Sequence, residues 1–122
     1  MNLIVMKFGG TSVADVKKIS HVANIVEQET KKNKVIVVLS AMAGVTNKME
    51  SYIKEAKSNH GIENDLILTS GENITIGLLS AILKNKNINS LPLLGWQVPI
   101  ITDDIHQKSK ILKIDKKRIF SF

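Results

Sequence analysis

The sequence predicts an α/β fold with a mainly parallel sheet, and three observations support this prediction. Two apolar runs, Leu3 to Val5 and Val35 to Leu39, have the length and composition of buried strands. The segment 15–30 between them repeats apolar residues every three or four positions, as a helix with one buried face does. Strand, helix and strand in succession indicate two parallel strands joined by a crossover helix.

A glycine pair follows the first strand. Gly9 and Gly10 end the extended run before a helical pattern begins at Asp15, and Lys7 precedes them. Consecutive glycines let backbone N–H groups approach an anion, and a following helix would direct its positive end to the same place. The lysine comes before the glycines, so the turn matches neither the Walker pattern nor the GxGxxG pattern. The turn is a candidate phosphate site, and a plain turn with a solvated lysine is the alternative.

The crossover helix should bring two loops together. Its predicted buried face consists of Val16, Ile19, Val22, Ala23 and Val26. A right-handed crossover places the carboxyl ends of both strands at one edge of the sheet. The Gly9-Gly10 turn and the loop 40–46 should therefore lie near each other, at the edge where open α/β sheets bind their ligands.

The second loop reads SAMAGVTN and carries two hydroxyl groups, those of Ser40 and Thr46. Such hydroxyls either cap turns and helices or contact a ligand, and the position beyond a central strand favours ligand contact. Asn47 followed by Glu50 is typical of a helix start. The predicted buried side of this helix is Met49, Ile53 and Ala56.

A third helix is predicted within 66–83, after a polar connection over 58–65. Its predicted apolar face is Ile74, Leu78, Ala81 and Ile82. The tripeptide Ser70-Gly71-Glu72 is placed near the start of this helix. A glutamate there is ordinarily a favourable partner of the helix dipole, and that is the alternative to a functional role for Glu72.

The last third of the chain is predicted to hold short strands. They are expected at Leu91 to Leu94, at Ile100 to Thr102 and at Ile111 to Ile114, and Asp115 has the character of a helix N-cap. Repeats, low-complexity tracts and linkers are absent from the sequence, so a single domain is expected.

Composition narrows the function classes. The chain has 122 residues, no cysteine and three scattered histidines, His21, His60 and His106, so we expect no metal held by side chains alone. A secretory leader and an apolar run of the roughly 18 residues that span a membrane are not recognised, which favours a cytoplasmic protein without a membrane contact. The net charge is +6, but 16 of the 17 basic residues are lysine and aromatic residues are few, so a nucleic-acid partner is not predicted.

Five motifs together produce a family resemblance. They are KFGGTSV at 7–13, SAMAGVTN at 40–47, SGE at 70–72, GWQV at 95–98 and Thr102-Asp103. In this order and spacing they resemble the aspartokinases, members of the amino acid kinase superfamily. The SGE and GWQV motifs favour aspartokinases over glutamate, carbamate or uridylate kinases. The resemblance covers essentially all of this chain but only the amino-terminal part of an aspartokinase, and it implies a truncated three-layer sandwich with a mainly parallel sheet.

The resemblance implies ATP-dependent phosphorylation of the side-chain carboxylate of L-aspartate, which leads towards lysine, threonine and methionine. Lys7 is the expected catalytic residue, because it would stabilise charge on the transferring group. The implied phosphate-binding residues are Lys7, Gly9, Gly10, Thr11 and Ser12. The implied substrate-binding residues are Ser40, Thr46 and Glu72. Mg²⁺ would arrive with ATP.

The resemblance also implies that residues 1–122 form only the amino-acid-substrate part of the kinase domain, without the nucleotide lobe and the ACT domains. The isolated chain is then expected to be inactive and to leave an apolar sheet edge uncovered. A separate carboxyl-terminal kinase lobe or a homo-oligomer would be the partner. A gene remnant and a non-enzymatic interaction or anion-binding module are the alternatives to a split enzyme. Pro99 and the stretch Asp104 to His106 depart from the family pattern.

Overall fold

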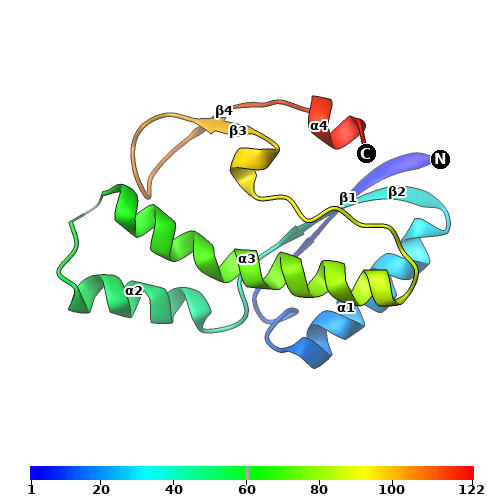
Figure 1. The fold of residues 1–122 in the computed structure, drawn as a ribbon, viewed down its shortest axis with the longest axis horizontal. Coiled ribbons are helices and arrows are strands. Elements are labelled where there is room, and N and C mark those ends of the chain that lie inside the picture. Colours follow the sequence, from blue (N-terminus) through cyan, green and yellow to red (C-terminus); the bar gives the residue numbers. More distant parts are fainter. Residues whose placement is uncertain (60) are drawn as a thin grey trace.

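The computed structural model, which describes residues 1–59 and 61–122, begins with a parallel pair of strands. Strands β1 (Asn2–Phe8) and β2 (Asn33–Leu39) pair in parallel, from Asn2 opposite Asn33 to Phe8 opposite Leu39. Helix α1 (Val16–Thr30) joins them (Figure 1). The predicted strand, crossover helix and parallel partner are confirmed.

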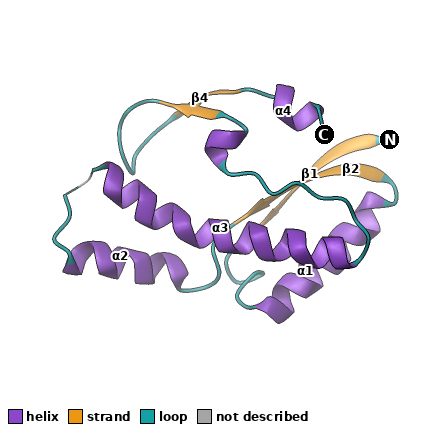
Figure 2. Cartoon of the chain, in the orientation of Figure 1, coloured by secondary structure: helices purple, strands orange, loops and turns teal. Residues whose placement is uncertain are grey.

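Two further helices follow, and the second of them packs beside α1 on this pair of strands. Helices α2 (Val45–Glu55) and α3 (Ile62–Asn85) follow β2, and α3 contacts both α1 and α2 (Figure 2). The buried core lies where α1 and α3 meet above the strands. Its members are Val13, Ile19, Val22, Ala23, Val26, Leu79 and Leu83. The predicted face of α1 is thus confirmed except at Val16, the first residue of the helix, which is exposed.

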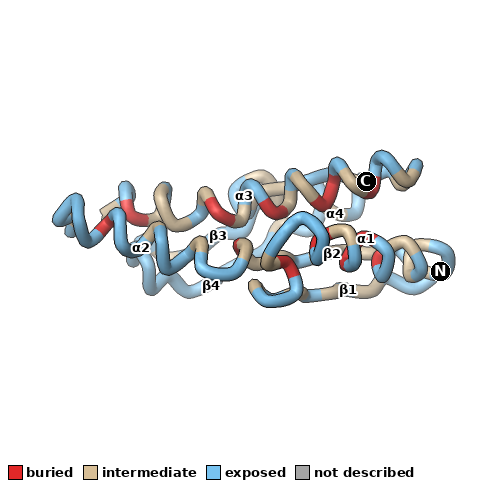
Figure 3. Tube along the Cα trace, turned by 90° about the horizontal axis from the view of Figure 1, so that it is seen from below, coloured by how far each residue is buried: buried red, intermediate tan, exposed pale blue. Residues whose placement is uncertain are grey.

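The two faces of the β1–β2 pair differ. Alternate side chains point to opposite faces of a strand. Phe8 on β1, with Val35, Val37 and Leu39 on β2, packs against the core, and we call this side the covered face. Leu3, Val5 and Lys7, opposite Lys34, Ile36 and Val38, form the open face. Figure 3 shows the burial along the chain.

The open face corrects one prediction about β2. The apolar run Val35 to Leu39 was expected to be buried on both sides, but Val38 is exposed and its neighbours are only half-buried. On β1, Val5 keeps 63% of its surface exposed. The α/β class is confirmed in truncated form, because the described residues build helices against one face and leave the other without a layer.

Helix α2 begins earlier than predicted. It starts at Val45 and not at Asn47, because Gly44 adopts φ +79° and turns the chain into the helix two residues sooner. Such a left-handed conformation is easy only for glycine. Of the predicted buried side, Ile53 is buried, Met49 is half-buried, and Ala56 lies beyond the last turn and is exposed.

Helix α3 also differs from the prediction in start and in buried face. It begins at Ile62, so Ser70-Gly71-Glu72 lies in the interior of the helix. The predicted face is wrong at Ile74, which is 56% exposed, and at Ala81, while Leu78 and Ile82 are half-buried. The residues of α3 that are buried are Asn64, Gly71, Thr75, Leu79, Ser80 and Leu83. Polar side chains can occupy this face because they are hydrogen-bonded: Thr75 donates to the Gly71 carbonyl oxygen at 3.2 Å.

By length and composition alone, α3 could cross a membrane. The sequence was expected to contain no apolar run near the roughly 18 residues that a membrane span requires. The core helix of a soluble protein passes the same test. Here α3 packs on α1 and α2 and contributes Leu79 and Leu83 to the core.

The carboxyl-terminal part forms a small hairpin. Strands β3 (Ile100–Thr102) and β4 (Ile111–Ile114) pair antiparallel, after a 3₁₀ turn at Gly95–Gln97 and a cis peptide bond between Val98 and Pro99. The short helix α4 (Lys117–Phe120) ends the chain.

Two predictions in this part need correction. Leu91 to Leu94 is not a strand, because no described strand pairs with it. The N-cap of α4 is Lys116 and not Asp115. Asp115 still accepts a hydrogen bond from the Lys117 amide at 3.0 Å, so it acts at the helix start without being the cap residue.

Candidate functional site

The glycine turn packs against the loop that follows β2. The Ser12 and Val13 amides donate to the Gly9 and Gly10 carbonyl oxygens, at 3.0 and 3.3 Å. A Cβ atom on Gly10 would lie 3.2 Å from the Ala41 carbonyl oxygen and 3.7 Å from the Ser40 hydroxyl oxygen. The two loops are therefore neighbours, as predicted, and Gly10 permits their close approach. A Cβ atom on Gly9 would meet nothing within 4 Å, so the surface there is open.

The start of α2 belongs to the same place. Gly44 supplies no side-chain hydrogen bond to the first turn of α2, so no side chain caps the amino-terminal N–H groups of this helix. Ala43, the residue before Gly44, approaches Gly10 closely. A Cβ atom on Gly10 would lie 3.8 Å from the Ala43 Cα atom. Thr46 lies exposed in the first turn of α2 and Ser40 is half-buried. The predicted pair of hydroxyls thus flanks one loop.

Helix α3 crosses this loop at Gly71. A Cβ atom on Gly71 would lie 2.8 Å from Val45 Cγ1 and 2.9 Å from the Ala41 Cβ atom, so only glycine fits without a shift. Glu72, the next residue of the helix, lines a cavity that also reaches Leu39 at the end of β2. Its Oε2 atom is buried and has no hydrogen-bond partner among the described residues. A buried carboxylate oxygen without a partner is costly, which marks Glu72 as a group able to receive a donor.

Ser70 is used within the protein. Its hydroxyl donates to the Ile67 carbonyl oxygen at 2.7 Å and contacts Met49 Sδ at 3.5 Å, which joins α3 to α2. The interior position of the motif also removes the helix-dipole alternative for Glu72, because that effect is confined to the first and last turns. The three residues of the SGE motif therefore do different things.

Lys7 lies at the penultimate position of β1, on the open face opposite Val38. It is exposed, and it forms no ion pair with a described residue. The parallel register puts it one residue before the point where the Phe8 carbonyl oxygen accepts from the Ser40 amide, at 3.1 Å. The side chain thus stands on the open face near the carboxyl ends of both strands.

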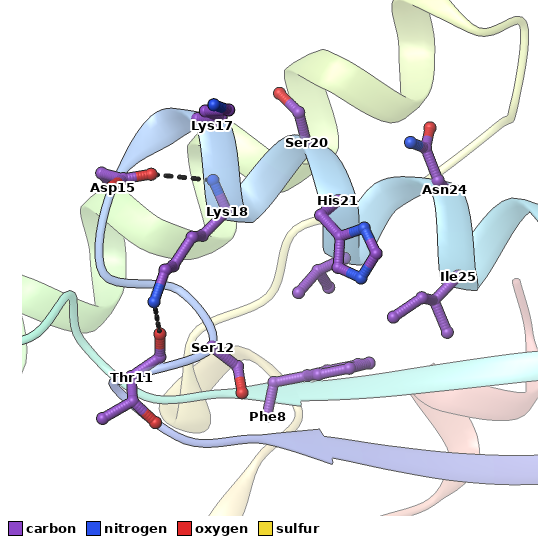
Figure 4. A pocket seen from close by; sticks show the side chains of 11 residues that line it. Phe8, Thr11, Ser12, Asp15, Lys17, Lys18, Ser20, His21, Asn24 and Ile25 are labelled. Atoms are coloured by element: carbon purple, nitrogen blue, oxygen red, sulfur yellow. Dashed lines mark hydrogen bonds between the residues drawn. The ribbon is translucent and has the colours of Figure 1, made fainter.

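Thr11 and Ser12 lie in a different environment from the rest of the predicted set. With Phe8 and His21 they line a shallow cavity of about 910 Å³ against α1 (Figure 4). The Thr11 carbonyl oxygen accepts from Lys18 Nζ at 3.2 Å. Among the described residues, no hydrogen bond joins the side chains of Thr11 or Ser12 to the loop that carries Ser40.

Helix α1 does not offer its amino-terminal end freely. The Asp15 carboxylate accepts from the Lys18 amide at 2.8 Å and caps the helix (Figure 4). A carboxylate at this position already receives the positive end of the dipole. From the sequence, the helix that follows the glycines, α1, was expected to direct its positive end to an anion. The helix with an uncapped amino-terminal end beside Gly10 is instead α2.

A contact that the sequence reasoning missed holds the hairpin over α3. Asp65, in the first turn of α3, lies 2.5 Å from His106 Nδ1 through one carboxylate oxygen and accepts from the Gln107 amide at 3.0 Å through the other. Asp65 carries no sequence signal, because its partners are 41 and 42 residues away. The departure from the family pattern at 104–106 therefore includes an anchoring histidine.

Metal ligands do not gather at this site. Within 1–59 and 61–122, no three His, Cys, Asp or Glu side chains are arranged to hold a metal ion. One of the three histidines considered for such a role, His60, lies outside the described residues.

Comparisons with known proteins identify the fold that carries these loops. A family model described as the amino acid kinase family matches residues 2–121. The chain belongs to the amino acid kinase family. An aspartate kinase from Synechocystis has a solved structure that superposes with a TM-score of 0.74 at 35% identity, over 79% of this chain and 17% of that one. The predicted resemblance is confirmed.

Curated relatives from bacteria in this kinase family are aspartokinases. The chain is 44% identical over 120 residues to the aspartokinase of Rickettsia bellii, a match that covers 94% of this chain and 30% of that protein. It is 42% identical over 122 residues to the aspartokinase of Geobacillus stearothermophilus, with 98% and 30% covered. Aspartokinase 2 of Bacillus subtilis is 41% identical over 117 residues, with 94% and 29% covered. The chain thus spans about 30% of the length of the relatives it matches.

Proposed function

We propose that this chain carries the amino-acid half of an aspartate kinase site and acts once the remaining part of the kinase domain is present. The reaction is transfer of the γ-phosphoryl group of ATP to the side-chain carboxylate of L-aspartate. A bond forms between a carboxylate oxygen and phosphorus, the bond to the ADP oxygen breaks, and 4-phospho-L-aspartate leaves. The identities of 41–44% to aspartokinases support this substrate over other carboxylates.

One observation carries the proposal. The buried Oε2 atom of Glu72 has no partner among the described residues, and Glu72 follows Gly71, the residue at which α3 contacts Ala41 and Val45. A substrate ammonium group would supply the missing donors and pair with the carboxylate charge. Ser40 and Thr46, from the same loop, would then donate to the carboxylate groups of aspartate.

The phosphate side of the site rests on backbone and charge. The open surface at Gly9 and the uncapped amino-terminal end of α2 offer N–H groups to phosphate oxygens. Lys7 would supply the positive charge that the transferring group needs most in the transition state. Thr11 and Ser12 would contribute only through their backbone, because their side chains line the cavity against α1.

ATP and Mg²⁺ would enter together in this proposal. The described residues contain no ligand cluster for a metal ion, so the ion would be held by the nucleotide phosphates and would neutralise their charge. The chain spans about 30% of its relatives, and the adenine-binding part would come from the rest of the kinase domain. The isolated chain is therefore expected to be inactive, and the assembled enzyme is expected in the cytoplasm.

The test uses the chain coexpressed with the part of the Geobacillus stearothermophilus aspartokinase that lies beyond the matched region. Glu72→Gln should raise the KM for aspartate about tenfold to a hundredfold, because it removes the charge from one strong hydrogen bond. Its matched control is Glu55→Gln, at the exposed end of α2. Equal changes in the KM values for aspartate and ATP would contradict the assignment of Glu72.

Lys7 is tested in the same complex. Lys7→Ala should lower kcat about a hundredfold to a thousandfold and leave both KM values nearly unchanged, because its charge acts chiefly in the transition state. Lys32→Ala, a solvent-exposed lysine after α1, is the control and should have no effect. A rise in the KM for ATP with unchanged kcat would assign Lys7 to binding and not to catalysis.

A further inference from the structure

One carboxylate ties the β3–β4 hairpin to α3. Strands β3 and β4 lie beside each other and beside the 3₁₀ turn, and within 1–59 and 61–122 neither strand lies beside an α-helix. The loop 103–110 between the two strands nevertheless reaches the first turn of α3 (Figure 1). Both contacts there end on Asp65: His106 Nδ1 lies 2.5 Å from its Oδ2 atom, and the Gln107 amide donates to its Oδ1 atom at 3.0 Å.

The backbone of this loop is shaped to make the contact. Gln107 adopts φ +62°, a left-handed conformation that residues with a side chain seldom take, and its amide is the group that donates to Asp65. The loop is also held from within, because the Ile105 amide donates to Asp103 Oδ1 at 3.2 Å. An uncommon backbone conformation persists where the surrounding contacts hold it, and such positions concentrate at functional sites.

The tie stands close to the candidate site. Asp65 and Glu72 are seven residues apart in α3, which is two turns and about 10 Å along the helix axis, so they lie on the same side of the helix. Leu66 and Glu72 line a cavity of about 1430 Å³, and Ile100 of β3 and Ile114 of β4 line the same cavity. The hairpin is therefore one wall of the cavity that Glu72 lines, and Asp65 holds that wall.

We propose that Asp65 and His106 are positioning residues, whose contact holds the β3–β4 hairpin in place as a wall of the Glu72 cavity and so fixes the space left for the amino-acid substrate. This inference rests on the proposed function for the identity of the ligand, and it adds the device that shapes the site. Neither residue contacts the substrate. A wall that is already in place before the ligand arrives lowers the cost of ordering on binding, so loss of the tie weakens binding more than it slows the chemical step.

A purely local role of Asp65 is the alternative. Glu63 and Asp65 are the acidic residues in the first turn of α3, where a carboxylate is favoured by the positive end of the helix dipole. The dipole accounts for an acidic residue at either position. It does not account for the convergence of a histidine and a left-handed backbone amide, 41 and 42 residues away, on Asp65. Glu63→Gln is a matched control, because it removes the same charge from the same turn.

The first measurement is the distance between two spin labels in the full chain, by pulsed electron paramagnetic resonance. The labels are attached at Lys110→Cys on the hairpin loop and at Lys84→Cys near the end of α3; both lysines are exposed, and the chain has no cysteine of its own.

Asp65→Ala should broaden the distance distribution at least about twofold, because the loop then loses both contacts with α3. His106→Ala, at an exposed position outside α3, should broaden it less, since the Gln107 amide keeps its acceptor. Glu63→Gln should leave it unchanged. An unchanged distribution in both the alanine variants would overturn the proposal.

The second measurement is steady-state kinetics of the complex with the carboxyl-terminal lobe of the Geobacillus stearothermophilus aspartokinase, which is the part beyond the matched region. Asp65→Ala should raise the KM for aspartate about tenfold and leave kcat and the KM for ATP nearly unchanged, because one wall of the cavity is no longer held in place. Asp65→Asn keeps an oxygen acceptor for the Gln107 amide and should recover part of this loss. A merely structural role would lower the amount of active complex and leave the KM unchanged.

The outcomes separate this inference from the proposed function. An active complex in which Asp65→Ala leaves the KM for aspartate unchanged would refute the positioning role and leave the proposed function standing. A complex without turnover would refute the proposed function. The tie between Asp65 and the hairpin would still stand in that case if the label distances broaden in Asp65→Ala and not in Glu63→Gln.

Discussion

The two faces of the β1–β2 pair are made of similar apolar residues and have different surroundings. On the covered face, Phe8, Val35 and Val37 pack against a core built by α1 and α3. On the open face, Val5 and Val38 remain exposed although their side chains are as apolar. Composition alone therefore does not decide burial. The chain supplies its own cover for one face, and in the proposed enzyme another part of the kinase domain would cover the other.

The largest expected effect on stability comes from shortening a core side chain beside the covered face, compared with shortening one on the open face. Ile19→Ala, at a fully buried position, should lower the free energy of unfolding by about 2–5 kcal/mol, since it removes buried methyl groups and leaves a cavity. Val5→Ala, at a position 63% exposed, should change it by less than about 0.5 kcal/mol. Urea unfolding of the two variants checks this pair. Similar losses would mean that the open face is already packed in the isolated chain.

The next largest effect on stability is expected from alanine substitutions at two glycines of α3, Gly71 beside the candidate site and Gly77 away from it. Gly71→Ala should destabilise the protein by about 1–3 kcal/mol, because the new methyl group would clash with Val45 and Ala41. Gly77→Ala, in the same helix with nothing within 4 Å, should stabilise it by about 0.5–1 kcal/mol through helix propensity. Thermal unfolding should therefore move in opposite directions. A shift of the same sign in both variants would remove Gly71 as the contact that positions Glu72.

The smallest expected effect on stability concerns the ion pair between α1 and the turn after α3. Lys86 on the turn after α3 donates to Glu27 of α1 at 2.7 Å, and this hydrogen bond, opposed by desolvation and assisted by the charges of Lys86 and Lys31, lowers the pKa of Glu27. The stability that Glu27 contributes is present above its ordinary pKa of 4.5 and is lost as the pH falls through the lowered value. Lys86→Met should make the unfolding midpoint less dependent on pH below 4.5. The effect is small because both side chains are partly exposed. If the substitution left the pH dependence of the unfolding midpoint below 4.5 unchanged, the ion pair would not be formed in solution.

The sequence predicted the parts of the fold that depend on local pattern. The face of α1 follows from spacing, and the meeting of the Gly9-Gly10 turn with the loop after β2 follows from the handedness of the crossover. The errors have a common physical origin in tertiary contact. Leu91 to Leu94 has strand composition but pairs with no strand among the described residues, and α3 buries Gly71 and Thr75 because small side chains allow close helix packing.

The candidate site was predictable as a set of motifs but not as a geometry. Glu72 lies in the interior of α3 because the helix starts at Ile62. Gly61 and the polar residues around it gave no sign of a helix start at that point. The separation of Thr11 and Ser12 from Ser40 depends on how the turn packs against α1, which no spacing rule contains. Asp65 was missed for the same reason, since its partners come from the distant hairpin.

The most direct test of the central claim is a titration of the purified chain with the Geobacillus stearothermophilus lobe, with aspartyl phosphate trapped by hydroxylamine. The chain alone should form no hydroxamate, and product formation should rise with added lobe to a plateau at one lobe per chain. The plateau should be lost in Lys7→Ala. Robust turnover by the chain alone that Lys7→Ala abolishes would contradict the account, because the half-site would then be a complete one. A stable complex without turnover would contradict it as well and would favour a non-enzymatic remnant of the kinase fold.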